Sequence, residues 1–324
     1  MMLLRRFTDF VLQGRLQAIG TAFALTFVPL IGTAISILIA ALVTLRRGVF
    51  EGALVLIAAS VVYVYDVASY ITSGEPHFII IIMVMMIISN VMTWLLAVVL
   101  RQYGNWAFVL EFAGFLGVGC VIFIHLMYPD IQTWWNNQFI DYFNRVLTMM
   151  GTVLKDEAAL AAQARGELVV FVKNNVVNTT GIVTAAILTN ALLQLLIARW
   201  WQAIMFNPTG LNTELNNIRL SYAAGILFVM AAVLAYFGNE VALDTMPVFY
   251  LVFFAAAWSL LHYWAATTKS PLIWLTLAYF MLGLLFVLAV INLTATWFFQ
   301  SVIVMVSVVA MLDIGLDFRK RLKR

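Results

Sequence analysis

Four polar side chains lie within long apolar stretches of the sequence, where a charge or an amide is costly to keep. They are Glu111, Asn90, Gln194 and His125. A carboxylate or an imidazole inside a bilayer usually serves a ligand or a proton, so these residues are candidates for ligand binding or proton carriage. Glu111 is followed by Gly114, Gly117 and Gly119, a spacing that would let a neighbouring helix or a ligand approach closely.

Each candidate also has a purely structural interpretation. Glu111 could pair with Arg101 at the membrane surface, and amides such as Asn90 and Gln194 commonly form hydrogen bonds between helices. His125 lies near the end of its apolar run, where it could exchange protons with the adjacent water. The residue types alone leave both interpretations open.

Signatures of common enzymes are missing from the sequence. It contains no H-E-x-x-H zinc motif, no G-x-x-x-x-G-K-[ST] phosphate loop and no G-x-S-x-G nucleophile elbow. The three histidines, at positions 77, 125 and 262, lack the spacing of metal ligands. The single cysteine, Cys120, excludes an intrachain disulfide and a Cys-rich metal site. We therefore expect no enzymatic activity, no cofactor and no metal.

The elements that hold these side chains must be membrane helices. Hydrophobic residues make up 64% of the 324 residues and charged residues only 10%, against ~25% in soluble domains. The net charge of +3 reflects where the basic residues lie and does not indicate a nucleic-acid partner. The composition predicts an all-α, polytopic integral membrane helix bundle whose main partner is the lipid bilayer.

Candidate spans follow from the apolar runs, because a helix needs ~20 apolar residues to cross a ~30 Å hydrocarbon core. Hydrophobic runs suited to this length lie at residues 48–65, 77–100, 105–127, 175–198, 220–238, 246–266, 271–291 and 297–314. The last run is followed by a strongly basic tail, which can reach the lipid headgroups.

The N-terminal stretch at 16–45 has no charged residue and would be about 45 Å long as one helix at ~1.5 Å per residue, too long for one upright span. Pro29 lacks a backbone donor and Gly32 permits a turn, so a break at 28–32 is expected. The resulting hairpin has two short arms, one of which could be re-entrant. With this hairpin the chain has about ten membrane segments.

The orientation of the segments follows from the Lys and Arg residues, which favour the cytoplasmic side. With the hairpin in place, fourteen of the 18 basic residues lie on the same side as the N-terminus. Acidic residues between the segments, including Asp244, fall mainly on the opposite side. Both termini are therefore expected in the cytoplasm.

A polar insertion at 128–174 separates a first membrane half, 1–127, from a second membrane half, 175–324. Five segments on each side would give the halves opposite orientations, as in inverted-repeat transporters, although the halves share no visible sequence similarity.

The first part of the insertion has helical periodicity. Apolar residues recur every three or four positions from Ile131 to Leu154, which predicts an external amphipathic helix with Trp134 and Trp135 near one end. This helix could lie on lipid, cover the outer mouth of the bundle as a lid, or dock a partner. An alanine-rich stretch at 158–164 predicts a second helical arm after it.

Three stretches on the expected cytoplasmic side combine charged residues with turn signals. They are LRRGVFEG at 45–52, the segment 207–220, and DIGLDFR at 313–319. Anchoring of helix ends would explain them, and so would a docking surface for a membrane or cytoplasmic protein partner. The docking candidates within them are Arg46, Arg47, Glu214, Arg219, Asp317 and Arg319.

Taken together, these stretches resemble the YybS-like family of bacterial polytopic membrane proteins, and the resemblance covers most of the chain. That family is distantly similar to the substrate-binding components of energy-coupling-factor transporters and to MreD-type proteins. The resemblance implies a location in the bacterial inner membrane and supplies no catalytic residue. A transporter-like or small-ligand-binding role is favoured because a glycine-lined carboxylate such as Glu111 inside a span is more than a scaffold needs. The alternative is a non-catalytic membrane scaffold or assembly partner.

Overall fold

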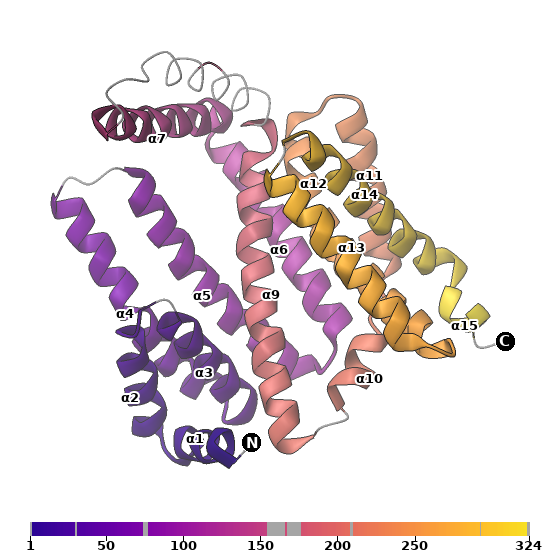
Figure 1. Ribbon diagram of the computed structural model, residues 1–324, viewed down its shortest axis with the longest axis horizontal. Helices are drawn as coiled ribbons and strands as arrows, with labels where there is room; N and C mark the ends of the chain where they lie inside the picture. Colours follow the sequence, from indigo (N-terminus) through magenta and orange to yellow (C-terminus); the bar gives the residue numbers. More distant parts are fainter. Residues whose placement is uncertain are drawn as a thin grey trace.

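The protein is described by a computed structural model, in which residues 2–29, 31–73, 77–153, 166, 176–207, 210–291 and 293–322 are described (Figure 1). Every element of regular structure in these residues is a helix. The elements up to the insertion are α1 (Met2–Gln13), α2 (Arg15–Thr26), α3 (Gly32–Arg46), α4 (Val49–Ser73), α5 (His77–Tyr103), α6 (Trp106–Met127) and α7 (Ile131–Val153). The later elements are the 3-10 helix η1 (Val176–Asn178), α9 (Thr179–Phe206), α10 (Gly210–Asn216), α11 (Tyr222–Tyr236), α12 (Glu240–Thr267), α13 (Pro271–Ile291), α14 (Leu293–Leu316) and α15 (Phe318–Leu322).

Helix length and composition make the chain a multi-pass membrane protein. In the described part of the chain, six helices are long and apolar enough to cross a membrane, namely α4, α5, α6, α9, α12 and α13. Shorter apolar helical segments are Gly32–Arg46, Tyr222–Tyr236 and Gln300–Leu316. The expected all-α membrane fold is therefore confirmed, while six long helices are fewer than the expected ten segments.

The N-terminal apolar stretch is divided into two helices around Pro29. α2 has 12 residues and α3 has 15, so at ~1.5 Å per residue they are about 18 and 22 Å long, less than the ~30 Å hydrocarbon core. Ser36 Oγ of α3 donates a hydrogen bond to the Ala22 carbonyl of α2 at 2.7 Å. The two arms therefore form a joined hairpin in which each helix alone is too short to span upright.

Several helices extend beyond the apolar runs that predicted them. α4 continues to Ser73, α9 continues to Phe206, and α12 begins at Glu240 and not at 246. Asn239 caps α12, because its side chain accepts a hydrogen bond from the Ala242 amide at 2.9 Å. A capped helix can begin with polar residues, so the apolar run alone underestimates its length.

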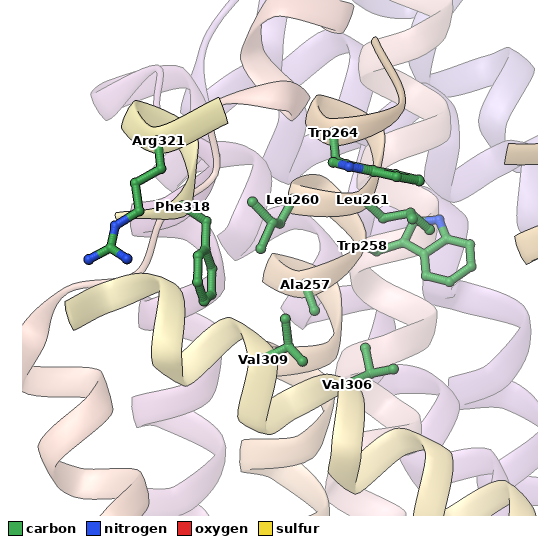
Figure 2. Close-up of a pocket in the computed structure, with 9 residues that line it drawn as sticks. All are labelled: Ala257, Trp258, Leu260, Leu261, Trp264, Val306, Val309, Phe318 and Arg321. Atoms are coloured by element: carbon green, nitrogen blue, oxygen red, sulfur yellow. The ribbon is translucent and has the colours of Figure 1, made fainter. Parts of the chain in front are cut away.

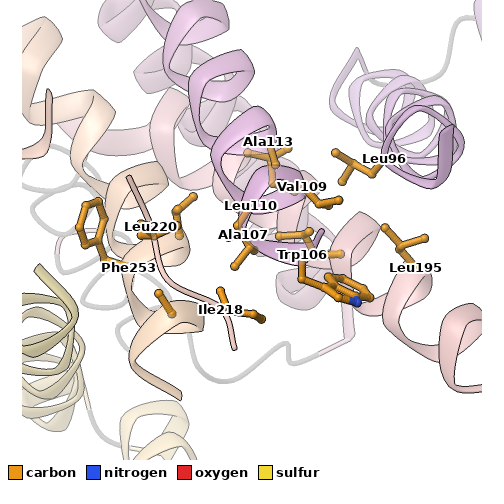
Figure 3. Packing of buried hydrophobic residues seen from close by; sticks show 14 of the residues in the cluster. Leu96, Trp106, Ala107, Val109, Leu110, Ala113, Leu195, Ile218, Leu220 and Phe253 are labelled. Carbon is orange, nitrogen blue, oxygen red and sulfur yellow. The ribbon is translucent and has the colours of Figure 1, made fainter. Parts of the chain in front are cut away.

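The bundle is organised around α9 and α12. α9 lies against α3, α5, α6 and α12, and α12 also lies against α11, α13 and α14. The main buried cluster includes Leu96 of α5, Trp106 of α6, Leu195 of α9 and Phe253 of α12 (Figure 3). The two halves on either side of the insertion therefore share one hydrophobic core.

Two of the glycines that follow Glu111 lie where α6 packs closely on its neighbours. A Cβ at Gly114 would be 2.9 Å from Val252 Cγ2 of α12, and a Cβ at Gly117 would be 2.7 Å from Leu188 Cδ1 of α9. These glycines let the three helices approach closely, which sets the position of the rest of α6.

The two ends of the bundle differ in composition (Figure 1). At one end α7 lies across the bundle beside η1 and the starts of α9 and α12, and we call this the α7 end. At the other end lie α1, α10, α15, the linkers after α3 and α5, and the end of α9, joined by contacts of Arg15, Arg101, Arg199, Arg219 and Arg319. We call this the basic end.

The amphipathic segment of the insertion forms α7. Ile131 and Trp135 are buried, and Phe139 and Phe143 pack around them against residues of α5, α6 and α9. Its apolar face therefore rests on the ends of other helices of the bundle. The second arm expected at 158–164 lies outside the described residues.

Candidate functional site

A buried ionisable pair joins α6 to α12 near the α7 end. His125 Nε2 lies 2.8 Å from Asp244 Oδ2, and the two side chains are 8% and 1% exposed. His125 belongs to the last turn of α6, and Asp244 follows the first turn of α12. Asp244 was expected in an external loop, but the early start of α12 places it inside the bundle.

The backbone of α9 completes the surroundings of this carboxylate. The Gly181 amide donates a hydrogen bond to Asp244 Oδ1 at 2.7 Å, so both carboxylate oxygens have a partner. Gly181 lies in the first turn of α9, where backbone amides have no acceptor in a preceding turn. A Cβ at position 181 would be 1.6 Å from the Asp244 carbonyl oxygen, so this close approach requires glycine.

α7 is hydrogen-bonded to α9 and α12, two of the three helices that form this site. Trp135 Nε1 donates to Thr180 Oγ1 at 3.1 Å, next to Gly181, and Gln132 Nε2 donates to Glu240 Oε2 at 3.3 Å. The site therefore lies beside α7, and two residues before Thr180 in the chain there is a buried acceptor, Asn178 Oδ1 of η1, without a partner among the described residues.

The pair joins an imidazole to a carboxylate through Nε2 of the His125 ring and Oδ2 of Asp244. Buried carboxylates and imidazoles of this kind form proton relays in membrane transporters.

Asn90 and Gln194 lie on a different surface, where α5 meets α4 and α9. Thr93 Oγ1 donates to Gln194 Oε1 at 2.7 Å, and Asn90 Nδ2 approaches Ser60 Oγ at 3.5 Å. These contacts are hydrogen bonds between helices, which is the structural interpretation that the sequence left open.

Glu111 lies apart from both of these groups. Its carboxylate accepts a hydrogen bond from the Ser221 amide at the start of α11. The carboxylate thus anchors the linker after α10 to α6, near the basic end. The structure does not bring Glu111 together with Asn90 and Gln194.

Glu214 is one of the docking candidates, and it makes contacts within the chain. It forms an ion pair with Arg199 of α9, and it accepts a hydrogen bond from Trp106 Nε1 of α6 at 3.2 Å. Both partners of Glu214 belong to helix ends, so this carboxylate fixes α10 against α6 and α9.

The last three docking candidates in the chain form a second network at the basic end. Asp317 Oδ2 lies 3.0 Å from Arg219 and 2.9 Å from Lys320. The hydrogen bond from Lys320 and the nearby Arg219 hold the pKa of the Asp317 carboxyl below its ordinary value. Arg319 donates to the Ile218 carbonyl at 2.6 Å, and burial lowers the pKa of its guanidinium.

Arg46 and Arg47 are exposed at the same end. The Arg46 guanidinium lies 3.8 Å from the centre of the Phe206 ring, and Arg47 donates a hydrogen bond to the Leu12 carbonyl. Arg46 also lines an open polar cleft of about 620 Å³ between α1 and the ends of α3 and α9. These two residues present more free surface than the other docking candidates.

Sequence reasoning missed two contributors to these polar contacts. Asp244 was missed because Pro247 follows it and the apolar run begins at 246, although proline is accommodated inside α12. Asn190 was missed because it lies in a long apolar run, and its amide donates to Ser89 Oγ at 2.7 Å. The spacing of Asn190 and Gln194, one helical turn apart, was a signal that could have identified that surface.

No group of three or more His, Cys, Asp and Glu side chains among the described residues could hold a metal ion. Comparisons with protein families, curated proteins and solved structures found no match to this chain.

Proposed function

We propose that this chain is a bacterial inner-membrane protein that binds or moves a small solute together with a proton, and that His125 and Asp244 carry the proton. The observation that carries the proposal is the buried contact of 2.8 Å between the two side chains. The proposal involves no covalent chemistry and assigns no catalytic residue.

The surroundings of the pair support this role. A proton carrier needs a group that changes its charge, a partner that stabilises the charged form, and access to water. His125 supplies the first, and Asp244, held by the Gly181 amide, supplies the second. The pair lies within about two turns of the ends of α6 and α12, so protons have a short way to travel from the α7 end.

Proton flux into liposomes that contain the full chain and a pH-sensitive dye tests the proposal. His125→Gln and Asp244→Asn should each lower the flux at least tenfold, because the glutamine and asparagine amides cannot take up or release the proton. His262→Gln is the matched control, since His262 is a partly buried histidine of α12 bonded to Tyr279. Full flux in His125→Gln would overturn the proposal.

Glu111→Gln separates this proposal from the other candidate carboxylate. The glutamine oxygen can still accept the hydrogen bond of the Ser221 amide but cannot carry a charge. Unchanged flux is expected if His125 and Asp244 carry the proton. Loss of flux with normal protein abundance would transfer that role to Glu111.

The membrane arrangement of about ten segments with both termini cytoplasmic is also part of this proposal. It is supported by the joined α2–α3 hairpin and by the gathering of arginines at the basic end. Reporter fusions after Arg47 should read as cytoplasmic, and fusions after Met127 should read as external. An external reading after Arg47 with a cytoplasmic N-terminus would contradict the hairpin.

A scaffold role is the second candidate function, and membership of the YybS-like family is compatible with either. The open cleft lined by Arg6, Asp9, Gln13 and Arg46 offers a cytoplasmic partner a polar surface. If the chain is a scaffold, Arg46→Glu should abolish capture of that partner, whereas His125→Gln should leave it unchanged.

A further inference from the structure

An apolar groove of about 480 Å³ lies between α12, α14 and α15, on a surface separate from the His125–Asp244 site (Figure 2). Its lining residues are Ala257, Trp258, Leu260, Leu261, Trp264, Val306, Val309, Phe318 and Arg321. Figure 2 shows Phe318 and Arg321 on one side and the two tryptophans on the other. Arg321 is the one charged residue in this lining.

The fold brings α15 back to the mouth of the groove. Asp317 adopts a left-handed backbone conformation with φ of 50°, which ends α14 and changes the direction of the chain. Asp313 Oδ1 then accepts a hydrogen bond from the Phe318 amide at 2.9 Å. As a result, Phe318 and Arg321 face the side chains of α12 and α14.

The groove has the depth of one lipid leaflet. From the end of α14 at Leu316 to Val306 the helix rises about 15 Å at ~1.5 Å per residue, which is half of the ~30 Å hydrocarbon core. Its deep part is lined by aliphatic side chains, and the charge of Arg321 lies at its shallow end. This polarity matches a molecule with an apolar chain and an anionic head.

The charge of Arg321 is available to such a head. Within α15, Lys320 pairs with Asp317 and Arg319 bonds to the Ile218 carbonyl, whereas Arg321 has no ion pair with any described carboxylate. Arginine binds phosphate oxygens through two parallel hydrogen bonds, which makes a phosphate group a suitable partner.

We propose that the groove binds one acyl chain of an anionic phospholipid, with its phosphate on Arg321. A second transmembrane helix fits poorly, because 15 Å of a helix about 10 Å across fills roughly 1,200 Å³, more than twice the volume of the groove. The groove lies within the range of about 300–1,000 Å³ that is usual for small-molecule sites. Phospholipid is also the molecule that surrounds this surface in the membrane.

Titration of the detergent-solubilised full chain with phosphatidylglycerol or phosphatidylcholine, read by intact-protein mass spectrometry, tests the proposal. The chain should retain one phosphatidylglycerol with about fivefold preference, the expected contribution of one basic residue at an anionic surface. Arg321→Gln should remove this preference. Lys269→Gln removes an exposed charge outside the groove lining and should keep it.

A second pair of variants tests the groove itself. Val309→Trp fills the groove and should prevent retention of either lipid, while Val308→Trp changes a neighbouring residue outside the lining and should not. The two valines are 45% and 39% exposed, so the pair is matched. Equal lipid retention in the two valine variants would mean that the chain holds non-specific annular lipid only, which would overturn the proposal. An unchanged preference of Arg321→Gln for phosphatidylglycerol would also overturn it.

Discussion

The two ends of the bundle each hold pairs of ionisable side chains, but in different surroundings. At the α7 end, His125 and Asp244 form a pair whose side chains are 8% and 1% exposed. At the basic end, the pair of Arg15 and Glu51 is much more open to solvent, with side chains 58% and 21% exposed, whereas Arg319 and Asp313 are 11% and 5% exposed. The difference in exposure separates the site proposed to carry a proton from contacts that anchor helix ends.

The physical reason for this difference is the dielectric environment. An exposed ion pair is screened by water and contributes ~0–1 kcal/mol, so many such pairs can collect where helices end. A buried pair depends strongly on both of its members, because the loss of one leaves the other without compensation. Changes at the α7 end should therefore have larger effects than changes at the basic end.

Removal of the Asp244 carboxylate should have the largest effect on stability. Asp244→Ala leaves His125 and the Gly181 amide without their acceptor, and it should lower the free energy of unfolding by about 3–5 kcal/mol. Thermal unfolding in detergent measures this loss. If Asp244→Ala unfolds like the unmodified chain, the buried pair does not stabilise the contact between α6 and α12.

A Cβ at position 181 should have the next largest effect. Gly181→Ala would place this atom 1.6 Å from the Asp244 carbonyl oxygen, so α9 and α12 must separate at a cost of about 3 kcal/mol. Gly119→Ala of α6 is the matched control, because nothing lies within 4 Å of its Cβ position. Equal unfolding temperatures of the two variants would contradict the close packing at Gly181.

Loss of charge at Glu214 tests the basic end with a smaller expected change. Glu214→Gln weakens the contacts with Arg199 and with the buried Trp106. Because the Arg199 and Glu214 side chains are 14% and 26% exposed, the change should cost about 1–2 kcal/mol. Protease sensitivity of the linker after α9 reports this change together with the unfolding curve. A loss as large as that of Asp244→Ala would remove the contrast between the two ends.

The smallest effect is expected at Asp317, as a change in how stability depends on pH. Its pKa is lowered in the folded chain, so its contribution to stability is present above the ordinary carboxyl pKa and is lost as the pH falls through the lowered value. Asp317→Asn should flatten this acid limb of the stability curve and lower stability at neutral pH by the same small contribution. If the acid limb is unaltered in this variant, the loss of stability at low pH comes from other carboxyl groups.

Much of the fold could be predicted from the residues themselves. The all-helical membrane class follows from composition, the break at Pro29 follows from a missing backbone donor, and α7 follows from the period of its apolar residues. Helix ends were predicted less well, because a hydropathy run stops at the first polar residues whereas a capped helix such as α12 does not.

Only one member of the His125–Asp244 pair could be predicted from the sequence. His125 could be identified because an imidazole stands out in an apolar run, but nothing in its sequence neighbourhood indicated its partner. Asp244 is 119 residues away along the chain and has the same local appearance as an aspartate in a loop. Glu111 stood out for the same reason as His125, and its carboxylate meets the Ser221 amide at a helix start.

Composition, charge distribution and apolar period are properties of short stretches of chain, so the sequence by itself determined that this protein is a bundle of membrane helices with an amphipathic helix after α6. The partner of each polar side chain was decided only by the tertiary structure. The energetic cost of burying a polar group is the same whichever neighbour satisfies it, and that neighbour is set by how α6, α9 and α12 pack. The close approach at Gly181 brings α9 against α12, while Gly114 and Gly117 bring α6 against both, and this packing places His125 beside Asp244.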